Sequence, residues 1–409
     1  MAHPQEFELF GPDFEANPYP TYAAMQQAPL YWQAWPNGGG VWIVTRYEDV
    51  AAILRDHKRF VKNYRNTLTP EQRAEMAPVP EIIQMIDNHL LSHDPPDHTR
   101  LRNLVGKAFT SRMVNQMQPR IEAIAGQLLD QVEPQGHMDL IEDYAFPLPI
   151  IVIAELLGLP VEDRRRLREW SKAFIAPVHD EAEYQVFKAK MLDFTDYLRM
   201  LFKERRQEPR QDLITALVQA EEAGDKLSEA ELFSMVILLI VAGHETTVNL
   251  IGTGVLSLLR QPDQLERLKE APSLIDGAIE ELLRYDGPVE TSTPRWAVED
   301  VEIGGQLIRR GQQVEVVLAA ANRDPAQFAQ PDRLDITRQD NRHLGFGLGI
   351  HYCLGAPLAR MEGKIALTKL LQRLPKLRLA APVETLQWLR LPPVRGLRSL
   401  PVRWDTSAR

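Results

Sequence analysis

The chain has 409 residues, 44% of them hydrophobic and 25% charged, which is the balance of an ordinary globular protein with a large core. Its 47 Lys and Arg residues against 56 Asp and Glu residues leave a net charge of −9, which argues against a protein that binds nucleic acid or an anionic membrane. The single cysteine excludes an internal disulfide bond.

One domain over residues 1–409 is expected, because no Gly/Ser-rich linker, charge block or repeat divides the chain. The first residues, MAHPQEFELFGPDF, contain no apolar signal segment. No stretch approaches the ~18 uninterrupted apolar residues of a membrane span. We therefore expect a soluble, cytoplasmic protein without a membrane attachment.

The N-terminal part of the chain alternates between short helices and strands. Residues 21–28 have helical spacing, and the apolar runs 30–33 and 41–44 are expected to pair as a hairpin. Residues 47–55 return to helical spacing. From 61 to 94 the pattern is weak and interrupted by prolines, which is typical of a loop, and loops often border binding sites.

A histidine and an arginine follow at helical spacing. Pro95 and Pro96 end the preceding segment, and Asp97 is expected to cap the next helix. His98 and Arg102 are four residues apart and therefore share one face of that helix. Two cationic donors one turn apart suit a carboxylate. The same pair is also typical of a solvated polar face, so by itself it assigns no function.

Residues 114–222 are predicted to be helix-rich packing segments, and a longer helix follows at 228–260. Ser228 and Glu231 form a capping-box pattern at its start. About 32 residues at ~1.5 Å each span roughly 48 Å, enough to cross a domain of this size. Residues 235–242 are apolar on every side, so we expect this helix to be buried.

The centre of the long helix contains a glycine and a carboxylate, Gly243 and Glu245, which are locally unfavourable in a core. Such departures tend to mark functional positions, although a glutamate with a structural partner is the alternative. Thr246 is expected to bond the carbonyl of Ala242, four residues back, and together with Gly243 to open the helix locally. A zinc-protease H-E-x-x-H motif is excluded, because its last position is Val248.

Two further elements precede the last helix. Residues 276–286 are predicted to be helical and carry Glu281 and Arg284, which alone could be a surface pair. Residues 295–318 alternate around glycine-containing turns and predict a small antiparallel sheet.

The only cysteine, Cys353, lies in a loop at 343–360 with glycines at alternate positions, which lets the backbone turn tightly against something bulky. A helix is predicted at 358–374, with Pro357 near its start. Nearby backbone N–H groups and this helix N-terminus are expected to favour the thiolate, a soft metal ligand or a nucleophile. A cysteine hydrolase is disfavoured, because His351 lies only two residues away on the same loop and no third residue orients it.

Residues 346–355, FGLGIHYCLG, match every fixed position of the F-G-x-G-x-H-x-C-x-G pattern, and in this the chain resembles the cytochrome P450 family. Three more of its patterns occur in family order: H-x-x-x-R at 98–102, A-G-x-E-T at 242–246 and E-x-x-R at 281–284. The resemblance implies a mainly α fold with small antiparallel β-sheets (α+β), in one large domain with a long central helix over the haem.

The resemblance also implies the site. Its cofactor is haem b (iron protoporphyrin IX), whose iron is bound by Cys353. The propionates are bound by His98, Arg102, Arg295 and His351, and Phe346 and Ala242 also contribute to the cofactor site. Glu245 and Thr246 are the catalytic residues, as a proton-delivery pair. Glu281, Arg284 and Arg333 are expected to form a buried network that braces the cysteine loop, with Leu334 where the family has an aromatic residue.

A bacterial-type monooxygenase is the function that this resemblance implies. It inserts one oxygen atom of O2, by hydroxylation or epoxidation, into a medium-to-large apolar molecule of secondary metabolism or a xenobiotic. Polyketide macrolides, terpenoids and steroids all fit. Electrons derived from NAD(P)H come through a ferredoxin reductase and a ferredoxin, since the chain carries no flavin or nicotinamide domain. Basic residues in segments near the cysteine form a candidate docking patch: Arg100, Lys107, Arg112, Arg342, Arg360 and Lys364.

Two alternatives stay open. One is a peroxide-driven peroxygenase, against which the Glu245–Thr246 pair argues, because such members generally lack it. The other is a non-catalytic haem-based gas sensor, in which an acid–alcohol pair has no purpose.

Overall fold

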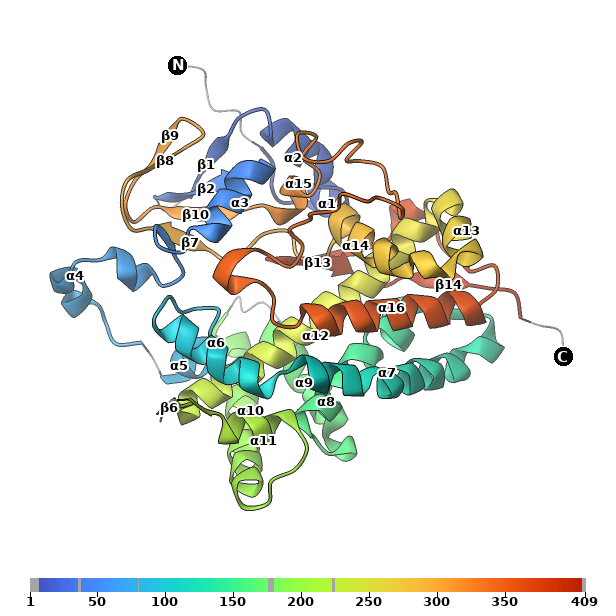
Figure 1. The fold of residues 1–409 in the computed structure, drawn as a ribbon, viewed down its shortest axis with the longest axis horizontal. Coiled ribbons are helices and arrows are strands. Elements are labelled where there is room, and N and C mark those ends of the chain that lie inside the picture. Colours follow the sequence, from blue (N-terminus) through green and yellow to red (C-terminus); the bar gives the residue numbers. More distant parts are fainter. Residues whose placement is uncertain (1–6, 36–37, 80, 176–179, 223–224, 407–409) are drawn as a thin grey trace.

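The computed structural model describes residues 7–35, 38–79, 81–175, 180–222 and 225–406. Residues 1–6, part of the N-terminal stretch predicted to hold no signal segment, lie outside this range. Helices dominate, and the predicted mainly α fold with small sheets is confirmed (Figure 1).

The helices are α1 (Pro12–Ala16), α2 (Tyr19–Met25), α3 (Tyr47–Arg55), α4 (Pro70–Glu75), α5 (Glu81–Asp87), α6 (Asp97–Ala108), α7 (Ser111–Val132), α8 (Pro147–Leu157), α9 (Arg164–Ile175), α10 (Glu181–Gln207), α11 (Leu213–Gln219), α12 (Glu229–Leu259), α13 (Pro262–Glu270), α14 (Ile275–Asp286), α15 (Leu318–Ala321) and α16 (Ala356–Arg373). The strands are β1 (Leu30–Ala34), β2 (Gly40–Val44), β3 (Phe60–Val61), β4 (His137–Asp139), β5 (Glu221–Glu222), β6 (Asp225–Lys226), β7 (Arg295–Ala297), β8 (Val301–Ile303), β9 (Gln306–Ile308), β10 (Gln313–Val316), β11 (Arg378–Leu379), β12 (Trp388–Leu391), β13 (Val394–Leu397) and β14 (Pro401–Arg403).

The largest sheet has the strand order β1-β2-β10-β7-β3. The predicted hairpin is confirmed, with Leu30 opposite Val44 in the antiparallel pair β1–β2. β10 runs parallel to β2, so this sheet is mixed, whereas wholly antiparallel sheets were expected. The long stretch of chain between β2 and β10 lets β10 enter in the parallel direction, which a short hairpin turn does not allow.

α12 crosses the helical part of the molecule and packs against α5, α8, α14 and α16 (Figure 1). Both hydrogen bonds of the predicted capping box are present, between Ser228 and Glu231. Among the described helices, α12 alone has the length and apolar composition of a membrane span, and most of its apolar window is buried within the protein. The expected burial of this helix is confirmed over most of its length.

Two local expectations are wrong. Asp97 does not cap α6, because Pro96 occupies the cap position and Asp97 is the first residue of the helix. At this position its negative charge interacts favourably with the positive end of the helix dipole, without a capping hydrogen bond. The segment 61–94 is also not a simple loop, since it contains α4 and α5, and α5 packs on α12.

Candidate active site

The loop around Cys353 is folded back on itself and packed against α3. The amide of Cys353 donates a hydrogen bond to the carbonyl of Phe346 (2.9 Å). Gly349 has a φ of 75°, and a Cβ at this position would lie 2.5 Å from the carbonyl oxygen of Leu54. Glycine is therefore required at 349 both by backbone conformation and by the close approach of α3.

Cys353 is exposed, and α16 begins three residues later, two residues earlier than predicted, with Pro357 in its first turn. The protein atoms around the sulfur nevertheless displace enough water to raise the pKa of the thiol. Hydrogen bonds from the amides of Gly355 and Ala356 and the charge of Arg102 lower this pKa by less. The amides at the start of α16 thus favour the thiolate, as predicted, but within the protein alone burial outweighs them. A bound metal cation favours deprotonation of a coordinating thiol further.

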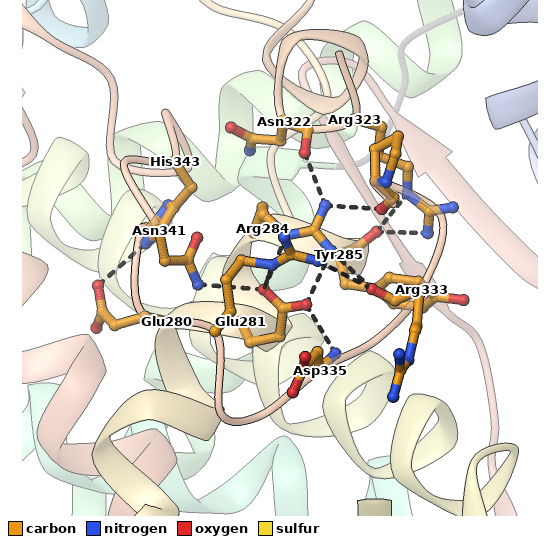
Figure 2. A network of polar contacts seen from close by, with 12 residues as sticks. Glu280, Glu281, Arg284, Tyr285, Asn322, Arg323, Arg333, Asp335, Asn341 and His343 are labelled. Carbon is orange, nitrogen blue, oxygen red and sulfur yellow. Dashed lines mark hydrogen bonds and ion pairs between the residues drawn. The ribbon is translucent and has the colours of Figure 1, made fainter. Parts of the chain in front are cut away.

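A chain of polar contacts holds the two aromatic residues of this loop. The guanidinium of Arg360 lies over the Phe346 ring, 4.4 Å from its centroid, and donates to the hydroxyl of Tyr352 (3.2 Å). Glu280 on α14 accepts hydrogen bonds from Arg360 at 2.6 and 2.8 Å. Its carboxylate also lies 3.0 Å from Nε2 of His343 (Figure 2). Sequence reasoning assigned no role to Glu280 or His343.

The residues predicted to bind the propionate carboxylates lie near one another and carry hydrogen-bond donors that no described residue accepts. They are His98, Arg102, Arg295 and His351. The rings of His98 and His351 meet edge to face with centroids 4.4 Å apart, and their buried nitrogens have no hydrogen-bond partner among the described residues. Arg102 likewise forms no ion pair within the described part of the chain, and its charge acts on Cys353. Arg295 is only 4% exposed, and its hydrogen bonds to described residues all come from Nη1.

The electrostatics of this cluster fit an anionic ligand. Burial, reinforced by His98 and the charges of Lys62, Arg295 and Arg102, lowers the pKa of His351 to about 2. Burial also lowers the pKa of Arg295 to about 10. His351 is thus a neutral donor, and the positive charge comes from the arginines. Such gathered cations and donors are costly without a counter-ion, so the site fits a ligand that carries carboxylates as well as a soft metal ion.

The predicted bond between Thr246 and Ala242 is present, at 2.6 Å from Oγ1 to the carbonyl oxygen. The helix α12 continues without a break through Gly243, so any local opening there leaves the helix intact. The ring of His244 is fully buried, with Nδ1 at 3.3 Å from Oγ of Ser171 and 3.8 Å from Oε1 of Glu245.

Glu281 and Arg284 form a buried network, as predicted, and are joined by two hydrogen bonds of 2.8 Å (Figure 2). The predicted third member, Arg333, contributes only its backbone oxygen, while its exposed side chain contacts Gln330. The second guanidinium on Glu281 comes from Arg338, at 3.1 Å. Arg338 reaches Glu281 in place of Arg333 because the chain passes Arg284 at residue 333 and turns back toward Glu281 five residues later.

The candidate docking residues differ in their surroundings. Arg100 is paired with Glu231 and, at 3.4 Å, with Asp225, so it ties α6 to the start of α12. Lys364 is 2.7 Å from Asp276, and Arg342 is 2.9 Å from Asp340. Arg112 and Lys107 are exposed. Arg100 is therefore the least available of the six for a partner.

Three comparisons with known proteins bear on this site. The cytochrome P450 family model matches residues 170–273 and 271–377. The polyketide biosynthesis cytochrome P450 PksS of Bacillus subtilis is 43% identical over 406 residues, covering 98% of both chains. The mycinamicin IV hydroxylase/epoxidase of Micromonospora griseorubida is 46% identical over 371 residues, covering 90% of this chain and 91% of the relative. The crystal structure of a myxobacterial cytochrome P450 in complex with myristic acid superposes with a TM-score of 0.89 at 46% identity, covering 98% of this chain and 99% of the other.

Proposed function

This chain belongs to the cytochrome P450 family, and on that premise we propose that it is a ferredoxin-fed monooxygenase that hydroxylates or epoxidises an apolar secondary metabolite. The family cofactor is haem b, which when bound supplies the activation of O2 and the transfer of one oxygen atom. The observation that carries the proposal is the exposed Cys353 within electrostatic reach of Arg102, in a region of unpartnered donors.

The residues present fit this cofactor. Cys353 offers one soft ligand for the iron, and His98, Arg102, Arg295 and His351 offer donors for two carboxylates. The pairing of Arg360 with Glu280, Phe346 and Tyr352 fixes the loop that presents the sulfur. Residues that hold a ligand's position in this way control its orientation and retention.

Glu245 and Thr246 would move protons. The hydroxyl proton of Thr246 is committed to Ala242, so its oxygen is oriented to accept a hydrogen bond on the site side of α12. The side chain of Glu245 is 16% exposed, which leaves a route by which it can exchange protons with solvent and pass them on. This pair supports O2-driven turnover over the peroxide-driven alternative.

The substrate and the electron donor are part of the proposal. The names of two relatives point to polyketide biosynthesis and to hydroxylation or epoxidation, so we favour a polyketide over a terpenoid or steroid. A small acidic ferredoxin suits the exposed Arg112 and Lys107. The predicted cytoplasmic location stays a prediction.

The first test is the visible spectrum of the purified protein after reduction and exposure to carbon monoxide. The strongly red-shifted Soret band of thiolate-ligated haem is expected, and Cys353→His should lose that band while still folding. A folded parent protein that binds no haem would refute the proposal. Product formation with NAD(P)H, ferredoxin and ferredoxin reductase then tests the electron route, and a polyketide panel tests the substrate class by spin-state shifts.

A further inference from the structure

A lysine that no motif predicted lies buried beside the carboxylate-binding residues. Lys62 is 7% exposed and directly follows β3, which pairs with β7 so that Val61 is opposite Trp296. The next residue along each strand is Lys62 on one side and Arg295 on the other. Two cations are thus held side by side in the interior, which is unfavourable unless something offsets their charge.

The ammonium of Lys62 is engaged by the segment that leads into Arg295. Its Nζ lies 2.8 Å from the carbonyl oxygens of Thr293 and Pro294 and also bonds the hydroxyl of Thr293. An ammonium has three donors, and all three are therefore used. Lys62 has no donor left for a ligand, so any effect on a ligand acts through charge or through other residues.

Asp94 joins the same cluster to α6. Its carboxylate accepts hydrogen bonds from the backbone amides of Lys62 (2.7 Å) and Asn63 (3.0 Å) and from the side chain of Asn66 (2.8 Å). The backbone carbonyl of Asp94 accepts from the amide of His98 (3.0 Å), in the first turn of α6. Lys62 and Asp94 therefore connect the segment before Arg295 to the helix that carries His98 and Arg102.

The contacts of Lys62 leave Arg295 available. The carbonyls of Thr293 and Pro294 are the nearest acceptors along the chain, yet Arg295 reaches only the first, from Nη1 at a long 3.4 Å. Lys62 occupies both of these carbonyls. Without it, Arg295 could turn onto them, and two uncapped carbonyl dipoles would oppose an incoming carboxylate.

We propose that Lys62 is a positioning residue for the cofactor: by occupying the Thr293 and Pro294 carbonyls, it keeps Arg295 free to bind a propionate carboxylate. This inference rests on the proposed function, because it requires haem b at this site. It predicts that the effect of Lys62 depends on the carboxylates of the cofactor and on Arg295.

The test compares two cofactors in the full chain. The parent and Lys62→Met are loaded with haem or with haem dimethyl ester, whose propionates are uncharged, and the rate of loss to an excess of a haem-free scavenger protein is followed. We expect Lys62→Met to lose haem about tenfold faster than the parent, the size typical of one buried charged hydrogen-bonding group. Both proteins should lose the dimethyl ester at equal rates. Lys58→Met, which removes an exposed lysine from the same segment, is the matched control and should match the parent.

A double variant tests whether Lys62 affects haem retention through Arg295. In an Arg295→Gln background, Lys62→Met should add little, since Lys62 acts through Arg295. Equal acceleration with haem and with the ester would show a merely structural role and overturn the inference, as would unchanged haem retention. If Lys62→Met does not fold, Lys62→Leu, which also removes every donor, carries the same comparison. A parent protein that takes up no haem refutes the proposed function itself. The rates of haem and ester loss test only the role of Lys62.

Discussion

The hydroxyl of Thr246 donates a hydrogen bond to the carbonyl oxygen of Ala242, 2.6 Å away, within an unbroken stretch of α12. Thr247 makes the same kind of bond to Gly243 at 3.2 Å, but Thr247 is buried. The two adjacent threonines thus make the same kind of bond, but Thr246 is partly exposed whereas Thr247 is buried.

Thr246→Ala should uncouple turnover, because the site loses the hydroxyl oxygen that accepts a hydrogen bond there and directs proton delivery. Product formed per NAD(P)H consumed is expected to fall several-fold while reductant is still used and hydrogen peroxide accumulates. Thr247→Ala is the matched control and should keep the coupling of the parent. Equal coupling in Thr246→Ala and the parent would remove Thr246 from the mechanism.

Glu245→Gln should slow turnover by about 10²-fold, the lower end for loss of a positioned proton donor, and should change the solvent isotope effect. The amide keeps the shape of the side chain but cannot exchange a proton with solvent. Glu229→Gln, an exposed position on the same helix, should leave both quantities unchanged. An unaltered rate and isotope effect in Glu245→Gln would contradict the relay.

Arg338→Ala should cost more stability than Arg333→Ala. The Arg338 side chain bonds the fully buried Glu281 and is itself 11% exposed, whereas the Arg333 side chain is at the surface. Removing one partner of a buried charge costs about 1–3 kcal/mol, and an exposed substitution about 0.5 kcal/mol or less. Urea unfolding of the haem-loaded protein measures both values, and a larger loss for Arg333→Ala would restore it as the third member of the network.

Gly349→Ala should destabilise the cysteine loop. The positive φ and the 2.5 Å approach of Leu54 leave no room for a Cβ, and strain of this kind costs on the order of 1–3 kcal/mol. Faster haem loss and a lower melting temperature are expected. Gly106→Ala, inside α6 with open space around its Cβ, should be neutral or stabilising. Similar stability of the two variants would show that the loop can move away from α3.

The stabilising interaction between Glu280 and Arg360 should weaken at acidic pH. Burial alone would raise the pKa of Glu280, but the hydrogen bonds and charges of Arg360 and His343 hold it lower, at about 2. A depressed carboxyl pKa gives stability that is present above the ordinary value of about 4.3 and is lost as the pH falls toward 2. The difference in unfolding free energy between the parent and Glu280→Gln should therefore be largest near neutral pH and shrink below about pH 4.5. The exposed Glu384→Gln control should show no such trend.

The sequence by itself determined the features that depend on residues close together in the chain. The capping box of α12, the Thr246–Ala242 bond, the β1–β2 pairing and the Glu281–Arg284 pair follow from spacing along a helix or strand. The uninterrupted loop pattern at 346–355 indicated the family, because its glycines and cysteine are contiguous and their spacing is fixed.

Only the tertiary structure decided the contacts between distant segments. Lys62 meets Thr293 across 231 positions, and Arg338 rather than Arg333 reaches Glu281, because chain paths set these contacts and no local period encodes them. The pKa of the Cys353 thiol also depends on how much water the surrounding atoms displace, a property of packing. Local hydrogen bonds are fixed by backbone geometry within a few residues, whereas burial and long-range pairing exist only once the chain has folded.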